Sequence, residues 1–124
     1  MHSPNGKIEV VRHSTGTYRG APNWSGSIEI PGRSFKLAKR SFYDPMAFST
    51  DSRFLAATES FSNGVSYDNS SRVVVFDFEK SKEIIVYTEA QGGIEEILWS
   101  DSLLLIKARS NVHGPREHRW KPGE

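Results

Sequence analysis

A short pattern occurs twice in the chain, about fifty residues apart. Residues 47–57 read AFSTDSRFLAA and residues 98–108 read LWSDSLLLIKA, so each segment runs from an aromatic through Ser and an Asp-Ser pair into an apolar stretch. Self-similarity at a period of this size is typical of proteins built from repeated supersecondary units. The pattern therefore predicts that one structural unit is used more than once in this chain.

Strand-sized runs separated by turn residues continue along the rest of the sequence. Residues 27–37 read SIEIPGRSFKL and predict a hairpin, because two alternating segments flank a Pro-Gly turn. The run RVVVFDF at 72–78 is almost continuously apolar, which favours a central strand covered on both faces. A helix competes only over 89–99, where Gly92 and Gly93 interrupt it. The expected strands are 7–13, 27–30, 34–37, 46–48, 54–58, 72–78, 83–87, 94–99, 102–108 and 118–120.

The turn pattern FSTDS at 48–52 resembles the turn that joins the first two strands of a blade in WD-repeat-like β-propellers. Phe76-Asp77 stands where the Trp-Asp dipeptide of such blades would fall, the Gly-His pair is missing, and the second turn is one residue shorter. The resemblance implies an all-β chain of about two and a half antiparallel propeller-like blades. Because a ring needs four or more blades, it implies an open half-propeller or twisted β-sandwich, a ring-completing oligomer, or a fragment.

The two Asp-Ser pairs are expected to be structural. Short polar side chains stabilise tight turns by hydrogen bonding to nearby backbone groups, so Asp51 and Asp101 need no catalytic role. The length of 124 residues predicts a single domain spanning residues 1–124.

Three longer connections, at 14–26, 59–71 and 109–117, are rich in Ser, Gly and Asn and are expected to be loops. Each follows the second strand of its unit, so the repeat places them on one rim. Tyr, Trp and Arg in such loops are the residue types that dominate protein interfaces, although Trp24 and Phe61 could equally tuck inward as anchors. The candidate partner-binding residues are Tyr18, Arg19, Asn23, Trp24, Phe61, Asn63, Tyr67, Asp68, His113 and Arg116.

Charge is unevenly distributed along the chain. Residues 1–40 carry seven basic and two acidic side chains, residues 41–106 four and eleven, and residues 107–124 five and two. This pattern fits ordinary solvated strand faces or a polarised surface that steers a charged partner. The acidic middle argues against nucleic acid as the partner, because it would repel phosphate.

The sequence contains no cysteine, no signal-peptide run and no stretch long enough to cross a bilayer. These features predict a cytoplasmic protein with no membrane association. No phosphate-binding glycine motif, nucleophile elbow or zinc-binding helix motif is present, and we expect no catalytic residue, metal or cofactor. A metal site at His113, Glu117 and His118, and an acid–base pair of His13 and His118 with Lys107, are the weaker alternatives.

The leading interpretation is a non-enzymatic protein-binding module. In size and style the chain resembles a bacterial immunity protein, of the kind associated with contact-dependent growth inhibition. That resemblance implies binding to a cognate toxin, a basic nuclease domain whose active site it blocks. The alternatives are a scaffold fragment or subunit of a larger β-propeller and, third, a small hydrolase or ribonuclease.

Overall fold

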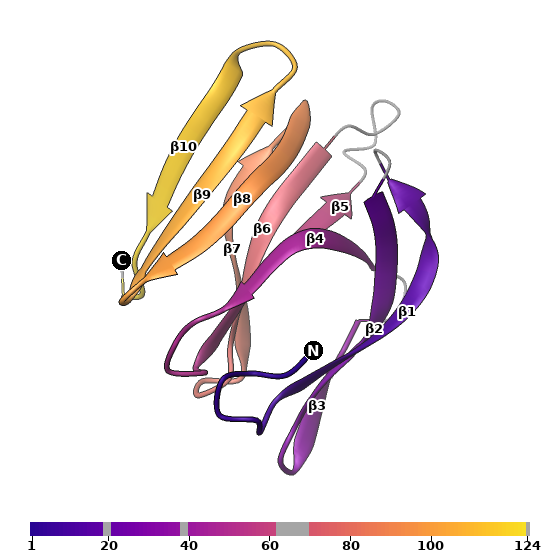
Figure 1. Cartoon of the computed structure of the whole chain (residues 1–124), viewed down its shortest axis with the longest axis vertical. Helices are drawn as coiled ribbons and strands as arrows, with labels where there is room; N and C mark the ends of the chain where they lie inside the picture. The colour runs from indigo at the N-terminus through magenta and orange to yellow at the C-terminus, as the bar shows by residue number, and fades with distance from the viewer. Residues whose placement is uncertain (19–20, 38–39, 62–69, 124) are drawn as a thin grey trace.

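The computed structural model describes residues 1–18, 21–37, 40–61 and 70–123, and this part of the chain is all-β (Figure 1). Every pairing between its strands is antiparallel, and no helix occurs in the ranges just given. The strands are β1 (Glu9–Tyr18), β2 (Ala21–Ile30), β3 (Arg33–Lys36), β4 (Ser41–Phe48), β5 (Phe54–Phe61), β6 (Ser70–Asp77), β7 (Lys82–Glu89), β8 (Gly92–Ser100), β9 (Leu103–Ser110) and β10 (Gly114–Trp120).

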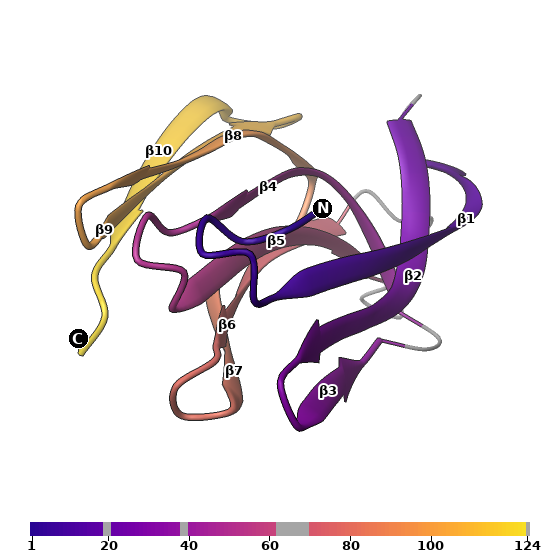
Figure 2. The ribbon, with the colours of Figure 1, turned by 60° about the horizontal axis from the view of Figure 1, so that its bottom comes forward.

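The first sheet has seven strands in the order β1-β2-β4-β5-β6-β7, with β3 paired to β2. It curls on itself without closing, which brings β3 toward the β6–β7 turn (Figures 1 and 2). Arg33 of β3 contacts that turn directly, because its guanidinium donates to the carbonyl oxygen of Phe78 and to the hydroxyl of Ser81. The predicted 27–37 hairpin is confirmed as β2–β3, with Ile28 opposite Phe35 on the face that packs into the core.

The second sheet has three strands in the order β10-β9-β8 and covers one face of the first. Figure 2 shows it lying above β4 and β5. Trp99 joins the layers, since its indole Nε1 donates to the carbonyl oxygen of Ala47 at 2.9 Å and its ring stacks on Phe54 with centroids 5.6 Å apart. Two layers of sheet in contact are the usual way for antiparallel strands to bury their apolar faces.

Strand β6 confirms the prediction of a central strand buried on both faces. Val74 and Phe76 point into a first core inside the curled sheet, whereas Val73 and Val75 point into a second core between the sheets. Because successive strand residues face opposite sides, a run of apolar residues is what a strand between two cores requires.

Both Asp-Ser pairs form turns, as predicted. In the first, Ser49 Oγ accepts from the Phe54 amide at 3.0 Å and donates to Asp51 Oδ1 at 2.7 Å, while Asp51 Oδ1 accepts from the Arg53 amide at 3.0 Å. The carboxylate thus secures the turn between β4 and β5 by local bonds. The second turn is tighter, because Ser100 pairs directly with Leu103.

The expectation of a loop over 14–26 was wrong. Within the described ranges these residues belong to long strands, with Ser14 opposite Trp24 and Tyr18 opposite Ala21. A bulge between Ser14 and Gly16 accommodates the irregular sequence. The third expected loop is also shorter than predicted, because β9 continues to Ser110 and β10 begins at Gly114. Backbone pairing in a hairpin outweighs the turn preference of individual Ser, Gly and Asn residues here, since strand propensity depends strongly on context.

Candidate functional site

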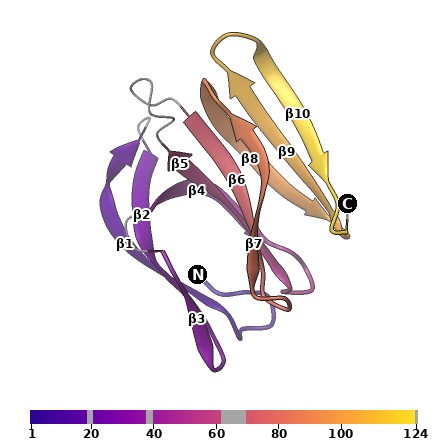
Figure 3. The ribbon, with the colours of Figure 1, turned by 180° about the vertical axis from the view of Figure 1, so that it is seen from behind.

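The predicted rim corresponds to one end of the molecule. The ends of β1, β5 and β9 and the beginnings of β2, β6 and β10 lie at the upper end in Figures 1 and 3, hereafter the upper end. Tyr18 and Phe61 are the last residues of their strands, and His113 immediately precedes β10. Four of the predicted partner-binding residues lie outside the described residues. These are Arg19 in the first expected loop, and Asn63, Tyr67 and Asp68 in the second.

Two of the predicted aromatic side chains are held by packing. Trp24 is only 5% exposed and stacks on Phe42 with ring centroids 5.0 Å apart, so it anchors β2 in the first core. Phe61 is half-buried, and the guanidinium of Arg72 lies 4.9 Å from its ring centroid. The structure therefore places Trp24 as an anchor whose ring is not free to contact a protein partner.

His113 and Arg116 line a cavity of about 340 Å³ at the upper end, where the β9–β10 hairpin faces the β7–β8 connection. Residues 88–91 form one side of it, and Ser110, Val112, His113 and Arg116 form the other. Val112 is 62% exposed, which makes it the most exposed large apolar side chain in the described part of the chain. The Ser110 hydroxyl accepts from the Val112 and His113 amides, both at 3.1 Å, and fixes the hairpin tip.

Glu89 gives this upper cavity a buried carboxylate. The residue is 5% exposed, and Tyr87 donates its hydroxyl to Glu89 Oε1 at 3.0 Å. Burial and the neighbouring Glu89 raise the pKa of Tyr87, while Arg116 acts in the opposite direction. The Tyr87 ring also packs on His118, with centroids 5.2 Å apart. A carboxylate beside donors of this kind can accept a cationic or hydrogen-bonding group that enters the cavity.

Sequence reasoning missed Glu89 and Tyr87. They are two apart on a strand and therefore share a face, as the alternation rule requires. That spacing was readable in the sequence, but the packing of β10 from the second sheet, which brings His118 against Tyr87 and Arg116 to the cavity, was not.

A second buried carboxylate, Glu59, lies on the first-core face of β5. It accepts from Arg40 at 2.7 and 3.1 Å and from Arg72 at 2.8 Å, and Arg40 also pairs with Glu83 at 2.7 Å. Burial raises the pKa of Glu59, but the bonds from both arginines outweigh it and leave the pKa below its ordinary value. Since Glu59 and Asp77 are both enclosed and paired with arginine, part of the acidic middle of the sequence is internal.

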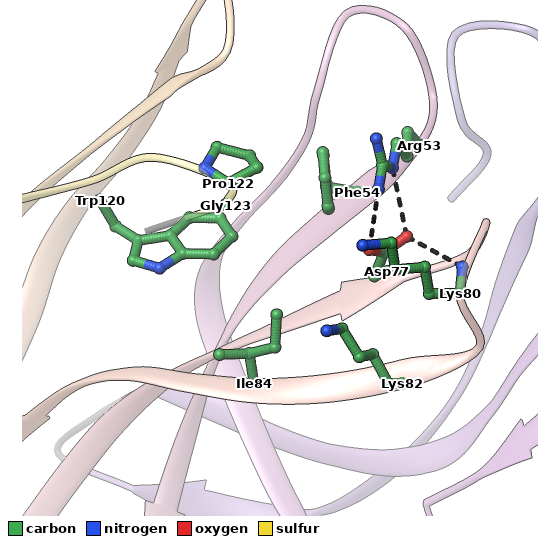
Figure 4. A pocket seen from close by; sticks show the side chains of 9 residues that line it. All are labelled: Arg53, Phe54, Asp77, Lys80, Lys82, Ile84, Trp120, Pro122 and Gly123. Atoms are coloured by element: carbon green, nitrogen blue, oxygen red, sulfur yellow. Dashed lines mark hydrogen bonds and ion pairs between the residues drawn. The ribbon is translucent and has the colours of Figure 1, made fainter.

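A third feature is a cavity of about 240 Å³ between the two sheets (Figure 4). It lies at the end of the molecule opposite the upper end, hereafter the lower end. Arg53 and Asp77 form an ion pair on one side, with Arg53 Nη2 3.2 Å from Asp77 Oδ2, and Trp120 stands on the other. Asp77 also accepts from the Glu79 and Lys80 amides, at 3.1 and 3.2 Å. These contacts fix the β6–β7 turn, so Asp77 has a structural role where it lies.

The histidine pair considered from the sequence is not brought together. His13 lies on β1 and His118 on β10, which form opposite sides of the molecule in Figures 1 and 3. Within residues 1–18, 21–37, 40–61 and 70–123, no three His, Asp or Glu side chains gather closely enough to hold a metal ion. The same ranges contain no helix long and apolar enough to span a membrane.

No protein-family model, curated protein or solved structure matches this chain in the comparisons made.

Proposed function

We propose that the chain is a non-enzymatic protein-binding module, and specifically a cytoplasmic immunity protein that binds a toxin domain and blocks its active site. The observation that supports this proposal is the upper cavity with its exposed hairpin tip. Val112 offers an apolar contact to a partner, and the adjoining cavity offers the Glu89 carboxylate. Interfaces commonly combine an apolar anchor with a pocket that receives one side chain of the partner.

The side chains that line the cavity favour a basic side chain on the partner. A lysine or arginine that enters the cavity would meet a carboxylate already removed from water, where charge pairing is stronger than at the surface. A basic nuclease domain carries such side chains where it binds nucleic acid. Arg116 and His113 at the rim would then contact acidic or carbonyl groups around the inserted side chain.

The experiment uses the protein encoded beside this gene. We expect the neighbouring gene to encode a nuclease-type toxin, and the two purified proteins to bind with nanomolar affinity in calorimetry. Val112→Asp and Glu89→Gln should each weaken binding at least about tenfold, because one disrupts the apolar anchor and the other removes the charge. The control is Glu79→Gln, since Glu79 is exposed at the β6–β7 turn at the lower end.

Absence of binding to any neighbouring gene product would refute the immunity function. Equal loss in the control and in the two test variants would instead show that the upper end is not the contact surface. A wild-type melting temperature in each variant excludes unfolding as the cause.

One observation favours the scaffold alternative as a second candidate. Strands β4–β7 form a four-stranded meander whose first two strands are joined by the FSTDS turn, and β8–β10 repeat its first three strands with the equivalent turn. We propose that these are successive propeller-like blades. If the chain is a ring subunit, light scattering after size-exclusion chromatography should give an oligomer with enough blades to close, whereas a monomer would refute this alternative.

A further inference from the structure

The lower cavity, between the two sheets at the lower end, carries more positive than negative charge. Among the described residues that line it, Arg53, Lys80 and Lys82 are basic and Asp77 alone is acidic. Asp77 is 3% exposed and pairs with Arg53, which also reaches Glu79 outside the lining at 3.5 Å. Because Arg53 and Asp77 neutralise each other, the charge left at the cavity is that of the two lysines.

Neither lysine is engaged by an acidic side chain. Lys80 and Lys82 form no ion pair with any residue in the described part of the chain. Glu83, which follows Lys82 on β7, points to the opposite face of the strand and pairs with Arg40 at 2.7 Å. Both ammonium groups are therefore available to an anion that enters the cavity.

The register of the first sheet places the lining residues on one face. Asp77 lies opposite Phe54 in one ladder and opposite Lys82 in the next, and directly opposite residues of antiparallel strands share a face. Ile84 comes two residues after Lys82, so it lies on the same face of β7. Since Phe54 belongs to the core between the sheets, this is the face that the second sheet covers.

The second sheet contributes an aromatic wall. Trp120, the last residue of β10, stands across the cavity from both lysines (Figure 4). Its ring meets that of Phe54 edge-on with centroids 6.2 Å apart, and Ile84 and Pro122 add apolar surface beside it. One side of the cavity is therefore cationic and the other is apolar. Sites for drug-sized ligands measure about 300–1,000 Å³, so a cavity of about 240 Å³ suits a smaller molecule.

We propose that the lower cavity binds a small aromatic phosphate monoester, of which phenyl phosphate is the simplest example. Lys80 and Lys82 hold the phosphate, and the ligand's ring lies against Trp120. A phosphate monoester carries about −1.5 to −2 charges at pH 7, which matches two ammonium groups better than the single charge of a carboxylate does. Lysine binds phosphate as a point charge, without the fixed geometry of arginine. This site lies at the opposite end from the partner surface, and either can exist without the other.

The test observes the aromatic wall directly. The indole N–H resonances of the three tryptophans are followed by NMR while phenyl phosphate is added to the full chain at pH 7. We expect the Trp120 resonance to shift and saturate with a Kd of about 1 mM, because a ligand of few atoms gains limited affinity. The Trp24 resonance should stay in place, since Trp24 is buried in the first core. Trp120→Phe identifies the resonance and keeps an aromatic ring at this position.

Substitution of the lysines tests the phosphate contact. Lys80→Gln and Lys82→Gln should each weaken phenyl phosphate binding at least about fivefold, because each removes one charge that faces the phosphate. The matched control is Lys107→Gln. Lys107 is exposed on β9 between Ile106 and Ala108, which face the core, so it lies on the outer face of the second sheet. Its loss should leave the Kd unchanged, and thermal unfolding verifies that each variant is folded.

Ligands that lack one half of phenyl phosphate separate the two contacts. Inorganic phosphate lacks the ring and benzyl alcohol lacks the charge, so each should bind at least about tenfold more weakly. A Trp120 resonance that does not move with phenyl phosphate would overturn the proposal. Equal weakening in Lys107→Gln would also overturn it, because binding would then follow the overall charge of the protein. Equal affinity for inorganic phosphate would overturn the contact assigned to Trp120.

Discussion

Arginine side chains pair with two of the enclosed carboxylates of the first sheet, Glu59 and Asp77. Glu59 is 3% exposed and receives bonds from Arg40 and Arg72, each of which also lies over an aromatic ring. The Arg40 guanidinium is 5.0 Å from the Phe42 ring centroid and therefore gains a cation–π contact as well as the ion pair. A carboxylate enclosed in this way remains charged only because both arginines accompany it.

Glu59→Gln should destabilise the protein. The substitution leaves Arg40 and Arg72 partly enclosed without a counter-charge, which we expect to lower the free energy of unfolding by about 2–3 kcal/mol. Denaturation in urea at pH 7 measures the change. The control is Glu95→Gln, whose pair with Arg109 is exposed on both sides and should contribute no more than about 1 kcal/mol. Equal losses in the two variants would contradict the role assigned to Glu59.

The same carboxylate predicts acid sensitivity. Because the pKa of Glu59 in the folded protein lies below its ordinary value of 4.5, its charge stabilises the fold above that pH. The contribution is lost as the pH falls through the lowered folded pKa. Urea midpoints measured from pH 6 downward should therefore fall less steeply in Glu59→Gln than in the wild type. Asp51 and Asp77, whose pKa values are also lowered, leave some acid dependence in the variant.

At the scale of strands, two glycines mark positions where backbones approach too closely for a side chain. A Cβ on Gly26 would overlap the carbonyl oxygen of Val11, and a Cβ on Gly92 would overlap that of Arg109. Gly92 begins β8 and lies opposite Ser110, beside the upper cavity. The register of the β8–β9 hairpin at this end therefore depends on a residue without a Cβ.

Gly92→Ala should lower the free energy of unfolding by about 1–3 kcal/mol, because β8 must shift away from Arg109 to relieve the overlap. Thermal unfolding followed by circular dichroism measures the loss. Gly6→Ala is the comparison, since nothing lies within 4 Å of its Cβ and only the strain of a positive φ of 74° remains. We expect Gly92→Ala to cost more, and the reverse order would contradict the close approach.

Strand positions were largely predictable because alternation and turn chemistry are local. The RVVVFDF run, the Pro-Gly hairpin and both Asp-Ser turns occupy the places that their residues predict. The hairpin of β1 and β2 was not predictable, because its Ser, Thr and Gly residues favour turns and only pairing with the opposite strand makes them extended. The same limit applies to the candidate site, since Glu89 and Arg116 line one cavity only because the two sheets pack together.

At the scale of the whole molecule, β5 and β6 divide the apolar residues between two cores. The curled first sheet encloses one core by itself, and the second core exists only because β8–β10 cover its other face. The sequence indicated repeated units but not this division, because which faces meet depends on the curl of the sheet. The upper cavity and the lower cavity both border the junction of the two sheets, so the second sheet must stay docked for either to persist.

Trp99 is the side chain on which this docking depends most directly. Its ring stacks on Phe54 and meets Trp120 edge-on with ring centroids 6.4 Å apart, and its Nε1 donates to the carbonyl oxygen of Ala47 in the first sheet.

Trp99→Ala should lower the free energy of unfolding by about 2–3 kcal/mol, and Trp99→Phe by about 1 kcal/mol through loss of the hydrogen bond. Leu98, the residue before Trp99 on β8, is 47% exposed, so Leu98→Ala should cost no more than about 1 kcal/mol. Hydrogen exchange adds a readout specific to docking: amides of β8–β10 should lose more protection than those of β5 and β6 in Trp99→Ala, whereas uniform loss would indicate that the two sheets unfold only together.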